Sequence, residues 1–561
     1  MAVLDTIKNG KATPHPVDEI PPFIKLFPLG LQHVLAMYAG AVAVPLIVGG
    51  AMVSAGQLDE GDIVHLIMAD LFVAGIATLI QSVGFWRFGV RLPLMQGVTF
   101  AAVGPMITIG TSHGITAIYG AVIASGIFMI VMAPVIGKLV RFFPPLVTGT
   151  IIVIIGVSLM RVAAGWFGGG TAKGEDFGEP KAIAFGFGTL VIILAIERFA
   201  PDSIRRVSVL LGLIIGTLIS IPFGMPNWDA VGENAWVGIP QPFQFGMPDF
   251  QFSAIISMII VAIVIMTETT GDIVAVGEIV DKKITPQKLA DGMRADGLGT
   301  VLGGVFNTFP YTAFAQNVGL VAITGVRTRH VASCAGIILV IFGLLPKMGA
   351  IVEGIPQPVL GGAGVALFGM VAASGVRTLS KVKFNNTNIL VVAISIGMAM
   401  LTEASLYYTD RSGGSPVDVK LDLYHQFPDW FQTIFHSGIS AGALCAIVLN
   451  LLLNTKSTSP DPVDYHNTGE IDVAPSASDA PRGPAFDPRD ALLAADPATT
   501  EETLRYLAQR DEGLHPFIVT NPSAPKDLCD WIKGLGDPKV LRLFEKWDGY
   551  THGDFSKRGS E

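Results

Sequence analysis

The sequence predicts an all-α polytopic membrane protein with about 14 transmembrane helices, followed by a small α-helical soluble domain. Half of the 561 residues are hydrophobic and 15% are charged, whereas soluble proteins are nearer a quarter charged. The mean hydropathy is +0.55. Apolar runs of roughly 20 residues, enough to cross ~30 Å of hydrocarbon, recur from Pro28 to Asn450.

The hydropathy pattern places an equal number of spans in each half of this region. The first half has expected spans near 28–52, 63–84, 92–110, 115–137, 144–164, 181–199 and 206–223. The second half has them near 252–272, 288–306, 311–325, 331–346, 351–375, 387–405 and 434–453. Three of these spans, 92–110, 288–306 and 311–325, are short or rich in Gly and Pro.

The charges of the loops indicate how the chain is oriented, because cytoplasmic loops carry an excess of Lys and Arg. With the N-terminus inside, most of these residues fall in cytoplasmic loops, among them Lys282, Lys283, Arg327 and Arg329. The long loop 224–251 on the opposite side has no Lys or Arg. We therefore expect a multi-pass protein of the cell membrane with both termini in the cytoplasm.

Short sequence motifs recur in spans that occupy the same position within each half of seven spans. The fifth span opens Phe143-Pro-Pro-Leu-Val-Thr-Gly149 and the twelfth opens Ile355-Pro-Gln-Pro-Val-Leu-Gly-Gly362. The third span has Leu92-Pro-Leu-Met-Gln-Gly97, and the tenth has Phe309-Pro followed by Gln316. An odd number of spans per half makes the repeat an inverted one (7+7), the usual basis of alternating access. Because the matches are short, chance similarity is an alternative of equal weight.

The composition predicts four parts of the chain. These are a cytoplasmic segment 1–25, a transmembrane domain 26–455, a flexible linker 456–490 rich in Ser, Pro and Asp, and a cytoplasmic helical domain 491–561.

The tail contains a repeat of about 25 residues. Asp496-Pro-Ala-Thr-Thr-Glu-Glu-Thr-Leu504 is echoed by Asn521-Pro-Ser-Ala-Pro-Lys-Asp-Leu-Cys529. Each unit reads as a turn followed by a short helix, with Leu504 and Leu507, or Cys529 and Ile532, facing inward. The tail resembles variant leucine-rich repeats, and we expect a small docking module for an unknown cytoplasmic partner.

The polar stretch around Gln316 and Asn317 is the strongest functional signal. Both amides lie in an apolar segment beside Gly319, and an unpaired amide in hydrocarbon costs several kcal/mol. Either the amides bond to neighbouring backbone or they face a cavity for a guest. Pro310 before them and the glycines among them suggest a broken helix, which transporters use at midplane sites.

Carboxylates occur within the spans, where charged groups usually face a cavity or a partner. Glu268 and Asp272, near the end of the eighth span, are one helical turn apart on one face. Two carboxylates in a low-dielectric site favour a shared proton, which suits a proton carrier; a solvated helix end is the alternative for Asp272. Asp296 either faces the pathway or caps a helix. His33 lines the pathway or, by the safer interpretation, braces neighbouring helices.

The third span carries the counterpart of this stretch. Thr99 and Phe100 follow Gln96 there. Phe100 and Phe314 could enclose a planar ring, although a phenylalanine in lipid usually only packs.

Several classes of function are not indicated. Cys334, Cys445 and Cys529 are far apart, so that neither a disulfide framework nor a metal site is expected. The sequence offers no nucleophile–base set or phosphate loop for an enzyme, no cofactor motif, and no basic block for nucleic acid.

With these residues in view, the chain resembles the nucleobase–ascorbate transporter family, also called nucleobase–cation symporter family 2, over about residues 20–455. The family signature is matched by Gln316-Asn317-Val-Gly319 through Thr324-Gly325. Supporting segments follow in the expected order: Gln32-His33, the Glu268 run, Ala295-Asp-Gly-Leu-Gly299 and Pro358-Val-Leu-Gly-Gly362.

The resemblance implies a core domain of spans 1–4 and 8–11 that moves against a gate domain of spans 5–7 and 12–14. It also implies homodimers, an elevator-type displacement, and short strands in spans 3 and 10. The proton gradient would be the coupling force, with no cofactor.

The resemblance also implies roles for single residues. Glu268 and Gln316 would bond the edge of the substrate ring, with backbone contacts from Phe100 and Ala315 on the short strands. Phe314 would flank the ring, and Asn317 would organise the site. Asp272 and Asp296 would serve proton coupling or hold the core.

Four positions bear on the substrate. Similar uracil carriers have Glu where this chain has Gln316, and His where this chain has Asp272. The two differences favour a purine as the substrate of this chain. Thr99 is similar to urate carriers, whereas Gly325 is more like xanthine carriers. We therefore expect a proton-coupled symporter that imports an oxopurine (xanthine or urate). The alternatives are a uracil permease, an anion carrier of the sulfate-permease type, and a nucleobase sensor.

Overall fold

The computed structural model describes two compact units, Met1–Thr468 and Gly469–Glu561. In the first unit it describes residues 15–135, 143–170, 177–403, 406–408, 417–419, 428, 431 and 437–454. In the second unit it describes residues 494–496, 498–510, 514–521, 523–535 and 540. The expected linker 456–490 lies outside the described residues.

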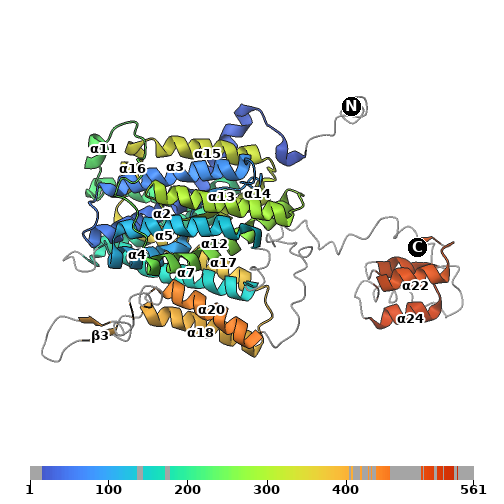
Figure 1. The fold of residues 1–561 in the computed structure, drawn as a ribbon. Coiled ribbons are helices and arrows are strands. Elements are labelled where there is room, and N and C mark those ends of the chain that lie inside the picture. The colour runs from blue at the N-terminus through green and yellow to red at the C-terminus, as the bar shows by residue number, and fades with distance from the viewer. Residues whose placement is uncertain are drawn as a thin grey trace. The chain divides into compact units, whose positions relative to one another are not determined.

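The first unit is a bundle of apolar helices that run side by side (Figure 1). Within the described ranges, seven helices are long and apolar enough to cross a membrane. They are α2 (Phe23–Ser54), α3 (Asp62–Val83), α5 (Ile115–Met132), α7 (Pro145–Phe167), α8 (Pro180–Phe199), α12 (Phe252–Ile279) and α17 (Gln357–Leu379). The pair α15 (Arg329–Gly343) and α16 (Pro346–Glu353), bent by 80°, could form one more span.

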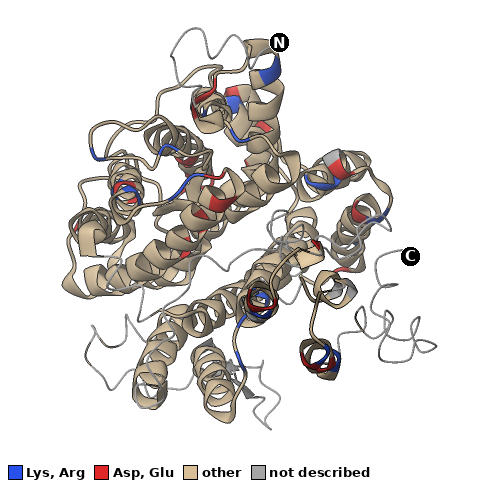
Figure 2. Cartoon of the chain, turned by 90° about the vertical axis from the view of Figure 1, so that its right-hand side faces the viewer, with Lys and Arg blue, Asp and Glu red and all other residues tan. Residues whose placement is uncertain are grey.

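The remaining helices of this unit are shorter or more polar. They are α4 (Val103–His113), α9 (Asp202–Arg205), α10 (Ser208–Ser220), α11 (Asp229–Glu233), α13 (Pro286–Val305), α14 (Ala315–Thr324), α18 (Asn386–Glu403) and α20 (Gly438–Asn454). Lys and Arg gather at helix ends and in loops (Figure 2). The chain is thus a mostly helical, multi-pass membrane protein, and the total of 14 spans stays a prediction.

Two expected spans are broken. Residues 92–110 contain the strand β1 (Gln96–Val98), the 3-10 helix η2 (Phe100–Ala102) and then α4. Residues 311–325 contain the strand β2 (Tyr311–Ala313) and then α14. The two strands pair antiparallel, with Gly97 opposite Thr312.

Close helix packing depends on reciprocal glycine contacts. A Cβ atom on Gly75 of α3 would lie 2.5 Å from the carbonyl oxygen of Gly336 on α15. A Cβ on Gly126 of α5 would lie 2.7 Å from the carbonyl oxygen of Gly297 on α13. Because lipid supplies no hydrophobic drive between helices, such small residues permit the close backbone contact that holds membrane helices together.

A short N-terminal segment packs against the loops at one end of the bundle. It contains the 3-10 helix η1 (Pro16–Asp18), whose Asp18 accepts hydrogen bonds from Lys282 Nζ (3.3 Å) and Arg329 Nε (2.8 Å). Partial burial opposes ionisation, but the two cations outweigh it and lower the pKa of the Asp18 carboxyl. Arg329 also donates to the carbonyl of Ser82 (2.9 Å), so that this segment links the ends of α3, α12 and α15.

The second unit is a small helical domain with its own core. Its helices are α22 (Glu501–Arg510), α23 (His515–Thr520) and α24 (Lys526–Gly534). Leu504, Leu507, Cys529 and Ile532, the residues expected to face inward, are all buried. Asn521 Nδ2 donates to the carbonyls of Ala494 (2.8 Å) and Asp496 (2.9 Å), which fixes the turn between α23 and α24 against the start of the domain.

We predict that Gly126→Ala lowers the apparent melting temperature of the purified protein by several degrees. The added methyl group would press α5 away from the Gly297 backbone, and overpacking of this kind costs about 1–3 kcal/mol. Gly188→Ala on α8 is the matched control, because its Cβ would meet nothing within 4 Å. Equal melting temperatures for the two variants would contradict the packing described.

Candidate functional site

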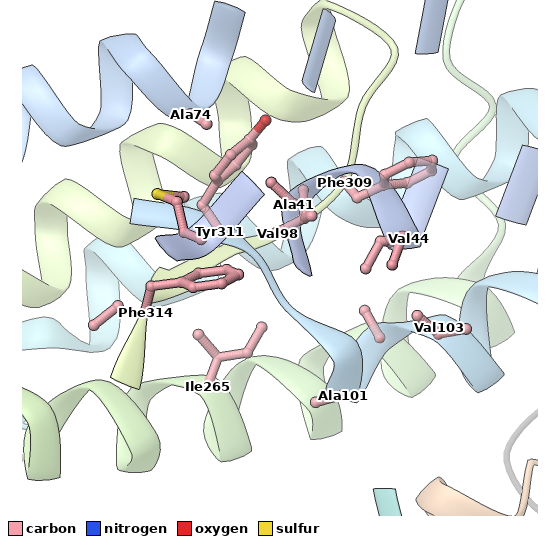
Figure 3. Close-up of a cluster of buried hydrophobic side chains, with 14 of the residues drawn as sticks. Ala41, Val44, Ala74, Val98, Ala101, Val103, Ile265, Phe309, Tyr311 and Phe314 are labelled. Atoms are coloured by element: carbon pink, nitrogen blue, oxygen red, sulfur yellow. The ribbon is translucent and has the colours of Figure 1, made fainter. Parts of the chain in front are cut away.

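The candidate site lies where β1 and β2 end and the helices after them begin. Backbone bonds extend the ladder beyond the strands: Thr99 N donates to the Pro310 carbonyl (3.0 Å) and Phe314 N donates to the Met95 carbonyl (3.0 Å). The Phe314 ring lies between this ribbon and Ile265 of α12 (Figure 3). The chain breaks of the two halves are therefore joined at one place, beside α12.

Phe100 and Ala315 do not lie on the strands, contrary to expectation. The strands end at Val98 and Ala313, so that Phe100 opens η2 and Ala315 opens α14. The Thr99 hydroxyl accepts a hydrogen bond from Ala101 N (3.1 Å) and caps η2. Thr99 is buried, and this cap is the hydrogen bond that its side chain makes within the described part of the chain. The first N–H groups of both helices point toward the breaks without intrahelical acceptors.

Gln316 and Asn317 are adjacent but lie in opposite environments. Asn317 is buried, and its Nδ2 donates to the His33 carbonyl (2.9 Å) and lies 3.0 Å from His33 Nδ1. This bond ties the start of α14 to α2, so that His33 braces the helices. Gln316 and Ala315 are exposed, and no hydrogen bond joins the Gln316 amide to the described part of the chain. The Gln316 amide is therefore free to bind a guest.

Glu268 and Asp272 lie on one face of α12, four residues apart. Both are half-buried, and neither has a hydrogen bond or an ion pair with any described residue. Helix α12 continues to Ile279, so that Asp272 lies about two turns inside the helix, and the interpretation as a solvated helix end is wrong. The helix continues because apolar residues after Asp272, among them Ile273 and Val276, extend its buried face.

Asp296 is fully buried in α13 and lies inside the helix, so that it does not cap its start. Its Oδ1 accepts a hydrogen bond from Gln81 Nε2 (2.9 Å) of α3. Gln96 and Thr269 also face this carboxyl. Thr269 Oγ1 lies 3.1 Å from Thr312 Oγ1 and accepts from Ala313 N (3.3 Å), which connects the cluster to β2.

Phe100 and Phe314 approach one point on α2. A Cβ on Gly40 would lie 3.1 Å from Phe314 Cζ and 4.0 Å from Phe100 Cε2. The Phe100 ring packs edge-on against Phe368 of α17, with centroids 5.8 Å apart. Phe100 and Phe314 do not stack on each other. A Cβ on Gly97 would lie 2.5 Å from Phe314 Cε2, so that glycine at this position lets the ring cover β1.

Sequence reasoning missed two buried polar residues near the ribbon. Asp70 and Gln81 both lie on α3. The available signal was the rule already applied to Glu268, since Asp70 and Gln81 are also polar residues within an apolar run.

A broken-helix pair inside a membrane bundle, with a free amide and two free carboxylates at the break, defines a membrane transporter. The family model described as "Permease family" matches residues 24–406. A second model, "Leucine Rich Repeat Variant domain", matches residues 488–546. The chain therefore belongs to the xanthine and uric acid permease family, which is the family that its Gln316 signature resembles. It is a transport protein and not an enzyme.

Two curated relatives illustrate the similarity. A xanthine permease of Bacillus subtilis (strain 168) is 44% identical over 436 residues, covering 78% of this chain and 95% of the relative. The uric acid transporter UacT of Escherichia coli (strain K12) is 42% identical over 463 residues, covering 81% and 92%.

Solved structures show the same fold at low identity. The transmembrane domain of the cyanobacterial bicarbonate transporter BicA has a TM-score of 0.51 at 15% identity, covering 68% of this chain and 97% of that one. The murine Slc26a9 anion transporter in the inward-facing state has a TM-score of 0.52 at 12% identity, covering 82% and 71%. At this identity the likeness concerns the fold alone.

We predict that only one of the two amides contributes to stability. Asn317→Ala removes the bond from α14 to the His33 carbonyl and leaves the buried His33 Nδ1 without the amide beside it, which costs about 1–3 kcal/mol and lowers the apparent melting temperature of the ligand-free protein. Gln316→Ala, the matched control one residue away, leaves it unchanged because its amide has no partner to lose. A destabilised Gln316→Ala, or an unaffected Asn317→Ala, would contradict this division.

Proposed function

We propose that this protein is a proton-coupled symporter that imports an oxopurine, xanthine or urate, through the cell membrane. The observation that carries the proposal is the exposed amide of Gln316 at the chain break, unbonded among the described residues, on a helix that packs against the Glu268-bearing α12. The relatives named as xanthine and uric acid transporters support the same substrate class.

The chemistry of the site suits an oxopurine edge. Such an edge alternates carbonyl acceptors and N–H donors, and the Gln316 amide offers one acceptor and two donors. A Glu268 carboxylate accepts from ring N–H groups, and charge-assisted bonds are the stronger ones. The N–H groups at the starts of η2 and α14 add donors. The half-buried Phe100 ring provides an apolar face for a planar ring, and the buried Phe314 ring supports the site from below its surface.

The same site suits proton coupling. Glu268, Asp272 and Asp296 are three carboxyl groups, and no described Lys, Arg or His forms an ion pair with any of them. Three uncompensated anions in a low-dielectric region are unfavourable. Binding a proton together with the substrate reduces this charge, and the proton gradient then drives import.

An elevator movement would divide the helices into a core and a gate. Helices α2, α3, α5, α12, α13 and α15 contact one another, whereas α7, α8, α10, α17, α18 and α20 contact mainly one another. The contacts α3–α15 and α5–α13 correspond to spans 2 with 11 and 4 with 9, the pairing that a 7+7 inverted repeat requires. As expected from the sequence, we propose a core of spans 1–4 and 8–11 and a gate of spans 5–7 and 12–14. We also propose that both termini are cytoplasmic and that the protein forms a homodimer.

An anion carrier is the second candidate, because the fold is shared with anion transporters. The relatives named as xanthine and uric acid transporters, at 44% and 42% identity, favour a purine over an inorganic anion. A uracil permease and a nucleobase sensor are separated from the proposal by the uptake experiment below.

Uptake into membrane vesicles tests the proposal. We expect accumulation of labelled xanthine or urate that a protonophore abolishes and that excess uracil or bicarbonate does not compete. Competition by uracil would reassign the substrate, and binding without any accumulation would indicate a sensor. Failure of every nucleobase to bind or accumulate would overturn the proposal.

Single variants separate binding from coupling. We expect Glu268→Ala and Gln316→Ala to weaken xanthine binding at least tenfold, because each removes a direct bond to the ring. Asp272→Asn should reduce accumulation more than binding, because it removes a proton carrier and keeps the shape. Asp229→Ala on the exposed α11 is the control. Equal loss of binding and accumulation in Asp272→Asn would remove Asp272 from the coupling role.

A further inference from the structure

Asp70 is a fully buried carboxyl in the middle of α3 to which no role has been assigned so far. Its Oδ1 accepts from the hydroxyl of Tyr311 (2.8 Å) and from Thr308 Oγ1 (3.3 Å). The Tyr311 hydroxyl also lies 2.9 Å from the Asp70 backbone carbonyl. No described cation forms an ion pair with Asp70, so that its contacts are hydrogen bonds to the segment that leads into the site.

Tyr311 is fixed at both ends. Its backbone N donates to Thr300 Oγ1 of α13 (3.1 Å) while its hydroxyl bonds Asp70 of α3. The fully buried ring fits over glycines of α13, since a Cβ on Gly303 would lie 3.2 Å from Tyr311 Cε2. Tyr311 is also the first residue of β2, so that these contacts determine where the strand begins.

Helix α3 holds the other strand in the same way. Gln96 N, at the start of β1, donates to Thr78 Oγ1 (2.9 Å). Thr78 and Asp70 are eight residues apart, about 12 Å along the helix. A ribbon of two three-residue strands is not stable by itself, so that its position depends on anchors of this kind.

We propose that Asp70 is a positioning residue for substrate binding, acting through Tyr311 and Thr308. It holds the first residue of β2, and the three residues of β2 lead directly to Phe314, Ala315 and Gln316. This inference rests on the proposed function, because it takes Gln316 as a substrate contact. Asp70 does not touch the substrate; it fixes the origin of the segment that does.

The variants separate positioning from proton transfer. Asp70→Asn keeps an acceptor oxygen for Tyr311 but cannot take up and release a proton, whereas Asp70→Leu removes the acceptor at similar volume. Tyr311→Phe removes only the hydroxyl and keeps the ring. The matched control is Tyr119→Phe on α5, because Tyr119 is equally buried and its hydroxyl has no hydrogen-bond partner among the described residues.

The experiment measures KM and Vmax for xanthine uptake in vesicles, normalised to inserted full-length protein. We expect Tyr311→Phe to raise KM about fivefold with Vmax within about twofold, and Asp70→Leu to raise KM at least tenfold because Tyr311 and Thr308 both lose their carboxylate acceptor. The double variant Asp70→Leu/Tyr311→Phe should have a KM for xanthine no higher than that of Asp70→Leu alone, because the carboxylate and the tyrosine hydroxyl are then both absent. Asp70→Asn and Tyr119→Phe should stay within about threefold of the parent.

Two outcomes would overturn the proposal. An unchanged KM in Tyr311→Phe would show that the hydroxyl bond does not position the site. Damage in Asp70→Asn equal to that in Asp70→Leu would show that the charge or the proton matters instead of the acceptor.

A substrate-independent readout separates this proposal from the proposed function. Ala315→Cys, in a background without Cys334, Cys445 and Cys529, places a reactive thiol on the exposed start of α14. We expect Tyr311→Phe to change its maleimide labelling rate at least threefold. Such a change without any xanthine uptake would support the positioning role and contradict the proposed substrate. An unchanged rate would contradict the positioning role.

Discussion

Backbone hydrogen bonding between β1 and β2 is the interaction on which the rest of the site depends. A chain that leaves the helical conformation within hydrocarbon exposes N–H and C=O groups that no water can satisfy. Here two such breaks satisfy each other through the three-residue register Gln96–Val98 against Tyr311–Ala313, continued by the bonds at Thr99 and Phe314. Each break makes the other possible, although more than 200 residues separate them in the chain.

This pairing has consequences for every functional side chain. It places the starts of η2 and α14 at the two opposite ends of the short ribbon and leaves Gln316 outside the ladder, where its amide has no partner among the described residues. The surrounding helices hold the ribbon through side chains: Thr269 from α12, Thr300 from α13, and Thr78 and Asp70 from α3. The reciprocal glycine contacts of α3 with α15 and of α5 with α13 bring these anchors close enough to reach it.

Much of the arrangement could be predicted from the sequence, because polar residues in apolar runs are conspicuous. Gln316, Asn317, Glu268 and Asp296 were found in this way, and the structure brings their segments together. The exact strand limits could not be predicted, because pairing with a distant segment decides them, which is why Phe100 and Ala315 were misplaced. Asp70 illustrates the same limit: its partner Tyr311 is 241 positions away, and no local spacing indicates that bond.

The most direct test of the account is a cryo-EM structure of the full-length protein with xanthine bound. The account predicts density for a planar ring at the chain break, with its edge within hydrogen-bond distance of the Gln316 amide and the Glu268 carboxylate, and with the β1–β2 pairing intact. Density for the purine elsewhere in the bundle, or at this place without contact to either side chain, would contradict it.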